Sequence, residues 1–173
     1  SGRHEAAAKA AATHTGALAG ADKVTQAAFD RAGILRVRGL AELFDAAETM
    51  ARFKPLDRAR VGIITNGGGA GVLAVDQIND CGGELAALSV ETLVRLDKLL
   101  PSTWSKANPV DMIGDADADR YKATVEIVAA DPEVDVLLIL NCPTGLASPV
   151  QAASAVAGLT DSGAISGKPV LAC

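Results

Sequence analysis

Short apolar runs alternate with amphipathic segments along the second part of the chain, from residue 61 onwards. Continuous aliphatic runs are typical of parallel strands buried on both faces, and apolar positions three or four residues apart are typical of helices. The pattern predicts five strands, over 61–65, 84–88, 109–113, 135–140 and 169–173. It predicts intervening helices over 71–80, 89–100, 117–130 and 148–159. This alternation favours an α/β fold with a flavodoxin-like, doubly wound sheet of five parallel strands.

The first 60 residues show a different organisation. Residues 1–20 are rich in alanine and glycine, and a helix there would be marginal because it has almost no apolar face. Helical spacing predicts helices over 21–32 and 40–53, and the apolar residues between them predict a short strand over 34–39. The segment that follows, up to residue 60, has the character of a linker. We therefore expect two parts, which comprise 1–54 and 61–173.

Composition and charge argue against several classes of protein. The chain has a net charge of −5 and no basic stripe that would meet nucleic acid or an anionic membrane surface. No apolar run reaches membrane-spanning length, and no secretory signal precedes the alanine-rich start. The three cysteines, Cys81, Cys142 and Cys173, match neither a disulfide framework nor a zinc site. We interpret them as reduced thiols of a cytoplasmic protein. Both ends of the chain look cut, so we expect a piece of a larger polypeptide.

A run of glycines follows the first predicted strand, in the sequence TNGGGAGV at 65–72. Three consecutive glycines allow positive φ angles and a close approach of backbone to ligand, and the N–H groups at the start of the next helix attract anions. The run has neither the lysine of a P-loop nor a complete dinucleotide-binding fingerprint. It is therefore either a phosphate or anion site or a tight turn that holds nothing. The candidate phosphate-binding backbone comprises Asn66, Gly67, Gly68, Gly69, Ala70 and Gly71.

Two further loops follow predicted strands, in NPVDMIGDADAD at 108–119 and NCPTGLASP at 141–149. Because ligands of such sheets bind at the carboxyl ends of the strands, these loops are expected to face the same crevice. The candidate lining residues are Asn108, Asp111, Asn141, Thr144 and Gly145. The alternative is that they only form turns, and that Asp115 or Asp117 caps a helix. The aspartates of the first loop have no spacing typical of a metal site, so we predict no metal there.

His14 is the candidate catalytic residue of the first part. It stands between two threonines in a segment with little to bury, and a neutral imidazole is available near pH 7 as a nucleophile. Attack on a phosphoryl group would produce a phosphohistidine that passes the group onward. Taken alone, such a histidine is more often only a solvated loop residue.

Several segments together resemble the NDP-forming acyl-CoA synthetases of the succinyl-CoA synthetase superfamily. They are SGRHEAAAKAAATHTGALAGAD at 1–22, AAFDRAGILRV at 27–37, VGIITNGGGAGVLAVD at 61–76 and NPVDMIGDADADRY at 108–121. The resemblance covers nearly the whole chain. It implies interconversion of acyl-CoA, ADP and phosphate with carboxylate, CoA and ATP, by way of an acyl phosphate and a phosphohistidine. It places that phosphohistidine on His14 and implies that the glycine run holds its phosphoryl group.

The resemblance also implies what accompanies the chain. The part at 1–54 would be the end of one CoA-ligase domain and the part at 61–173 most of the next. CoA, ATP or ADP and Mg²⁺ would be bound mainly by a CoA-binding domain and an ATP-grasp domain, on the same polypeptide or a partner subunit of an oligomer. The fragment alone would then be inactive. In relatives fused to acetyltransferases the corresponding module looks regulatory, so a ligand-sensing role is the alternative function. Which carboxylic acid is used, and whether ADP or GDP, stays open.

Overall fold

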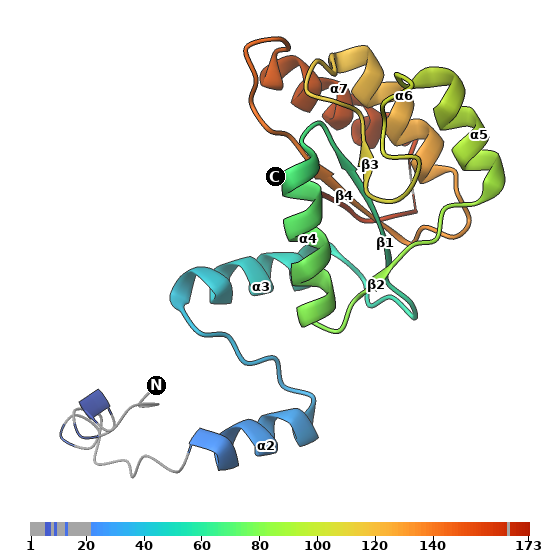
Figure 1. Cartoon of the computed structure of the whole chain (residues 1–173). Coiled ribbons are helices and arrows are strands. Elements are labelled where there is room, and N and C mark those ends of the chain that lie inside the picture. The colour runs from blue at the N-terminus through green and yellow to red at the C-terminus, as the bar shows by residue number, and fades with distance from the viewer. Residues whose placement is uncertain (1–5, 8, 10–12, 14–21, 166) are drawn as a thin grey trace. The chain divides into compact units, whose positions relative to one another are not determined.

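The computed structural model describes residues 6, 7, 9, 13, 22–165 and 167–173. The chain divides into two compact units, Ser1–Pro55 and Leu56–Cys173 (Figure 1). Within these described residues, no helix combines the length and the apolar character needed to cross a bilayer. His14, the candidate phosphoryl carrier, lies outside the described residues.

The first unit contains helices α2 (Asp22–Ala32) and α3 (Leu40–Arg52). The strand predicted over 34–39 is wrong, because this segment is an irregular connection without strand pairing. Arg36 connects this segment to α2, because its Nη1 donates a hydrogen bond to Gln26 Oε1 (2.9 Å) and its guanidinium forms an ion pair with Asp22. Neither helix has a buried residue, and large apolar side chains of both are exposed: Val24, Leu40, Leu43, Phe44 and Met50.

The second unit is built on a parallel sheet of five strands, which confirms the predicted fold class. The strands are β1 (Arg60–Thr65), β2 (Glu84–Leu85), β3 (Val110–Asp111), β4 (Val136–Leu140) and β5 (Val170–Ala172). Their order is β2-β1-β4-β5, and β3 also pairs with β1. β4 occupies one edge of β1 along its length, while β2 pairs with the first residues of β1 and β3 with the last. β2 and β3 therefore lie end to end along the other edge of β1.

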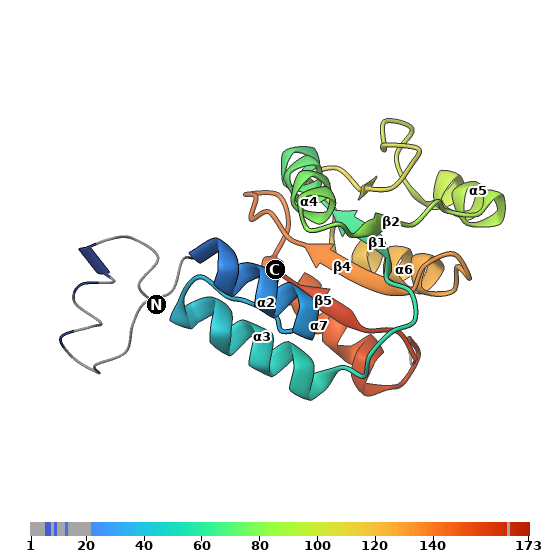
Figure 2. The same cartoon turned by 90° about the horizontal axis from the view of Figure 1, so that it is seen from below.

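Helices cover both faces of this sheet. They are α4 (Gly68–Asp80), α5 (Val90–Leu99), α6 (Ala118–Ala129) and α7 (Pro149–Asp161). α6 packs between α5 and α7 on one face, and α4 lies on the other face beside β1 (Figures 1 and 2). The core between the layers is aliphatic, with Ile64, Leu137 and Val125 fully buried. Small side chains allow the helices to approach the sheet closely, as the alanine- and valine-rich composition suggests.

Capping side chains set three of the helix starts where the sequence placed them. Ser89 Oγ accepts a hydrogen bond from Thr92 N (3.2 Å), and Asp117 Oδ1 accepts one from Arg120 N (2.8 Å). Ser148 caps α7, with proline at its first position. These contacts satisfy N–H groups that the first turn of a helix leaves without a carbonyl partner. α4 differs, because it begins at Gly68, three residues before the predicted start, and no side chain caps it.

A candidate anion site at the carboxyl edge of the sheet

The glycine run forms the first turn of α4 and not a loop ahead of it. Gly67 N donates to Thr65 Oγ1 (3.0 Å), and Gly67 O accepts from Ala70 N (3.0 Å) and Gly71 N (3.2 Å). Gly68 and Gly69 are exposed, and their N–H groups have no acceptor within the part of the chain that the structure describes. Among the five residues 67–71 of the predicted cradle, the chain itself engages the N–H groups of Gly67, Ala70 and Gly71, so those of Gly68 and Gly69 are available.

Close packing, and not positive φ, explains Gly67 and Gly68, whereas Gly69 has open space at its Cβ position. A Cβ on Gly67 would lie 2.5 Å from Cys142 Sγ, and a Cβ on Gly68 would lie 2.7 Å from Asp111 Oδ2. Gly67 has a φ of −138°, and none of the run belongs to the described glycines with positive φ. The expectation of left-handed backbone at this turn is thus wrong. Gly67 and Gly68 instead allow α4 to begin in close contact with the loops that follow β3 and β4.

Asn66 does not offer its side chain to a ligand. Its Oδ1 accepts from Cys142 N (2.7 Å), its Nδ2 donates to Cys142 O (2.9 Å), and the residue is buried. The side-chain amide thus continues the pairing of β1 with β4 by one step beyond the strands. Asn66 fixes where the glycine turn begins and does not face the crevice.

Asn108 was expected to line the crevice, and its side-chain amide is engaged within the sheet. Its Oδ1 accepts from Ile63 N (2.9 Å), while its Nδ2 donates to Val61 O (2.8 Å) and Ala86 O (2.9 Å). A residue of a neighbouring parallel strand would bond β1 in the same way. The amide of Asn108 therefore fills the gap between β2 and β3 along the edge of β1, so its role is structural.

Asp111 lies beside the start of α4. Its Oδ1 accepts from Ile113 N (3.0 Å), its backbone N donates to Ser105 Oγ (2.9 Å), and its Oδ2 lies beside Gly68. Ile113 has a φ of +70°, which is unusual for a β-branched residue and turns the chain sharply after β3. The carboxylate and the two available amides thus lie next to each other at the start of α4.

The predicted site residues of the loop after β4 have different partners. Thr144 Oγ1 donates to Gly114 O (2.8 Å), which ties this loop to the β3–α6 loop, and a Cβ on Gly145 would have open space. Asn141 lies elsewhere. Its Nδ2 donates to Tyr121 Oη (3.0 Å), which itself donates to Leu140 O. Burial raises the pKa of Tyr121 to about 12. Both side chains line a mostly apolar cavity of about 520 Å³ between α7 and β5.

The aspartates of the β3–α6 loop have other partners. Asp115 forms an ion pair with Arg120, whose hydrogen bond lowers the pKa of that carboxyl group, and Asp117 caps α6. The capping interpretation is therefore confirmed for Asp117. Among the residues that the structure describes, no three histidine, cysteine or acidic side chains are placed to hold a metal ion. Cys81, Cys142 and Cys173 are free thiols, of which the first and last are exposed.

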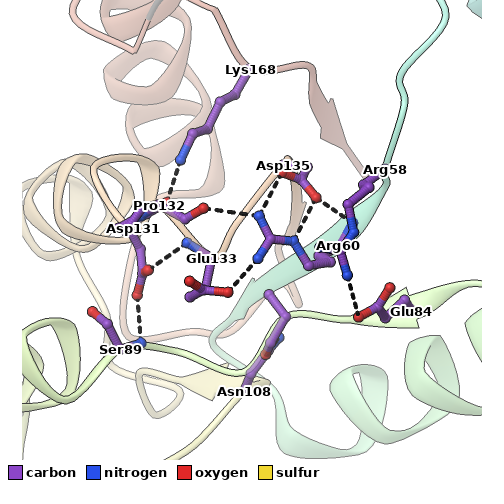
Figure 3. Close-up of polar contacts among 11 residues, drawn as sticks. Arg58, Arg60, Glu84, Ser89, Asn108, Asp131, Pro132, Glu133, Asp135 and Lys168 are labelled. Carbon is purple, nitrogen blue, oxygen red and sulfur yellow. Dashed lines mark hydrogen bonds and ion pairs between the residues drawn. The ribbon is translucent and has the colours of Figure 1, made fainter.

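A second polar cluster lies at the opposite, amino edge of the sheet, and the sequence did not reveal it (Figure 3). Arg60 binds both carboxylate oxygens of Asp135, from Nε (2.8 Å) and Nη2 (2.9 Å), and also contacts Glu133. The Arg60 hydrogen bonds hold the pKa of Asp135 well below its ordinary value. Asp131 is buried and accepts from Ser89 N (2.8 Å) and Glu133 N (2.9 Å). Because Arg60 stands at the start of β1 and Asp135 directly before β4, their ion pair fastens these two strands together.

Comparison with known protein families matches both parts of the chain. Residues 1–50 match the succinyl-CoA ligase like flavodoxin domain, and residues 61–172 match the Ligase-CoA domain. The second match alone covers more than half of the chain.

Individual relatives agree with these matches. The alpha subunit of ADP-forming acetate–CoA ligase I from Pyrococcus furiosus is 40% identical over 155 residues, which cover 90% of this chain and 33% of that protein. ADP-forming acetate–CoA ligase I from Archaeoglobus fulgidus is 36% identical over 157 residues, covering 91% of this chain and 23% of that protein. The chain thus spans about a quarter to a third of the length of these relatives.

A solved structure is similar over almost the whole chain. It is dinucleotide forming acetyl-coenzyme A synthetase 1 of Candidatus Korarchaeum cryptofilum, in complex with phosphate and ADP. The TM-score is 0.87 at 34% sequence identity, and the match covers 99% of this chain and 37% of that one.

Proposed function

The chain belongs to the CoA-ligase family that the Ligase-CoA domain defines, and on that premise we propose that it is part of an NDP-forming acyl-CoA synthetase that relays a phosphoryl group through His14. The relatives reported above are ADP-forming ligases, which favours this catalytic role over a regulatory module of an acetyltransferase fusion. The proposed net reaction converts acyl-CoA, ADP and phosphate into carboxylate, CoA and ATP.

Two transfers pass through the histidine. A lone pair of the His14 imidazole attacks the phosphorus of an acyl phosphate, the P–O bond to the acyl oxygen breaks, and its electron pair leaves on the carboxylate product. An oxygen of the ADP β-phosphate then attacks the same phosphorus, and the N–P bond breaks with its electrons returning to the ring. Such transfers depend on positioning and on stabilisation of charge on the phosphoryl oxygens.

The observation that carries the proposal is the pair of available amides at the start of α4. Gly68 and Gly69 are exposed, and a helix start carries a partial positive charge where its N–H groups lack acceptors. α4 is 13 residues long and packs on the sheet, so its first turn is a fixed point for an incoming phosphoryl group. The related structure in complex with phosphate and ADP supports the same chemistry.

The proposal includes partners beyond this chain. Residues 1–54 would complete a CoA-ligase domain supplied mainly by other segments, which would cover the exposed apolar side chains of α2 and α3. Residues 61–173 would form the next CoA-ligase domain. CoA, ATP or ADP, and the carboxylic acid would bind mainly to a CoA-binding domain and an ATP-grasp domain of the same polypeptide or a partner subunit. We assign Mg²⁺ to those domains, and the protein to an oligomer in the cytoplasm. The 173-residue chain alone is then expected to be inactive.

A labelling experiment tests the relay in the full-length protein that contains this chain. Incubation with γ-³²P-ATP should produce an acid-labile, base-stable label on the protein. The label should disappear in His14→Asn and persist in the matched variant His4→Asn, which replaces the other histidine of the chain. A label that survives His14→Asn, or that never forms in an enzyme with synthetase activity, would contradict the proposal.

A further inference from the structure

We propose that the cavity between α7 and β5 is a docking site for an α-helix from the rest of the full-length polypeptide, and that this helix leads to a further parallel strand on the free edge of β5. The inference rests on the proposed function, which makes the chain part of a longer synthetase. The relatives agree with this, because the chain spans only about a quarter to a third of their length.

β5 has a free edge with unpaired backbone groups. It is the outermost strand beside β4, where Pro169 O accepts a hydrogen bond from β4 and Cys173 N donates one to it, at 2.9 Å each. Alternate residues of a parallel strand turn their N–H and C=O groups to opposite neighbours, so those of Val170 and Ala172 point away from β4. Within the described part of the chain no strand pairs with them. Such an edge can bind one more strand.

The cavity of about 520 Å³ lies beside this edge, on the face of the sheet that α7 covers. Val156 of α7 is buried, whereas Ala153 and Ala157, which also line the cavity, are exposed. Val170 and Ala172 of β5 line it as well. α6 packs along α7 on the side toward α5. The side of α7 toward the free edge is therefore apolar and uncovered in the described part of the chain.

The topology of the sheet indicates which element fits this position. The chain passes from β4 through α7 to β5, one step outward across the sheet, and parallel β–α–β crossovers are right-handed. A further outward step from β5 would therefore place its helix on the face that α7 covers and its strand beside β5. The cavity and the free edge lie at these two positions. One helix and strand of the same polypeptide would thus fill both.

The lining of the cavity defines the helix face that fits it. None of the described residues that line it is charged, and the small side chains of Ala152, Ala153 and Ala157 leave room for large apolar side chains. A charged side chain buried there would have no partner, which strongly disfavours it. The docking helix should therefore present large aliphatic or aromatic residues at three- and four-residue spacing, with no charge on that face.

Hydrogen exchange followed by mass spectrometry, applied to the 173-residue chain and to the full-length protein, tests the inference. The Val170 and Ala172 amides should exchange at least about a hundredfold more slowly in the full-length protein, because they donate to the added strand. Ala157→Glu places a charge in the cavity, so it should remove this protection and leave exchange in the 173-residue chain unchanged. Gln151→Glu, on α7 but outside the lining, is the matched control and should keep the protection. Circular dichroism verifies that each variant is folded.

Three results would overturn the inference. The two amides could exchange equally fast in both proteins, or Gln151→Glu could remove the protection as fully as Ala157→Glu. Protection that appears in the 173-residue chain as its concentration rises would assign the edge to a second copy instead. The His14 labelling experiment is independent of these results. Label on His14 without protection of β5 removes the docking helix alone, whereas protection of β5 without label on His14 removes the relay alone.

Discussion

Replacing Asn108 with alanine should lower the free energy of unfolding of the second unit. The substitution removes three hydrogen bonds and leaves Ile63 N and Ala86 O without their partner, while Val61 O keeps the hydrogen bond from Ala86 N (3.0 Å). Ile63 and Ala86 are buried, and each buried backbone group without a partner costs about 1–3 kcal/mol. For these two buried groups together, we expect a loss of about 3 kcal/mol in the free energy of unfolding. In a unit of roughly 120 residues this lowers the melting temperature by about 12 °C.

Urea denaturation of the 173-residue chain, followed by circular dichroism, measures this loss. Asn108→Asp should be at least as unstable as Asn108→Ala, because a carboxylate cannot donate to the two carbonyl oxygens. Asn79→Ala, at an exposed position of α4, serves as the matched control and should change stability by less than about 0.5 kcal/mol. A loss below about 1 kcal/mol for Asn108→Ala would refute the view that this amide replaces a strand residue.

Three further changes test other contacts. Gly69→Pro removes one of the two available N–H groups and should slow phosphoryl transfer in the full-length enzyme by about tenfold. Gly69→Ala keeps the N–H group and places its Cβ in open space, so it should retain wild-type rates. Thr124→Val should raise the free energy of unfolding by about 1 kcal/mol in urea titrations, because the buried Thr124 hydroxyl has no hydrogen-bond partner among the residues that the structure describes. A loss of stability would show that the hydroxyl is bonded. The depressed pKa of Asp135 means that its pairing with Arg60 stabilises the fold above the unfolded-state pKa of about 4 and loses this effect as the pH falls further. Asp135→Asn should therefore be less stable than the wild type at pH 7, with the difference narrowing below about pH 4; a difference independent of pH would contradict this account.

The sequence by itself determined the order and type of the elements in the second unit. Aliphatic runs such as that of β4 differ in period from the amphipathic helices, and capping residues such as Ser89 and Asp117 bind N–H groups only three residues away. Such signals are local, so they survive without knowledge of the fold. The same local reasoning failed at 34–39, because a strand exists only where a neighbouring strand pairs with it.

Only the tertiary structure decided which polar residues face the crevice. Asn66, Asn108 and Asp111 all stand near strand ends, yet two of them bind backbone groups of the sheet and only Asp111 reaches the start of α4. The identity of a short polar side chain does not show whether its partner will be a ligand or a peptide group from another strand. The partner is decided by which segment, 40 or more residues away along the sequence, packs beside the residue in the fold. The hydrogen bond from Ile63 N to Asn108 is an example. The reach of Asp111 to Gly68, for the same reason, became visible only once β3 was paired with β1.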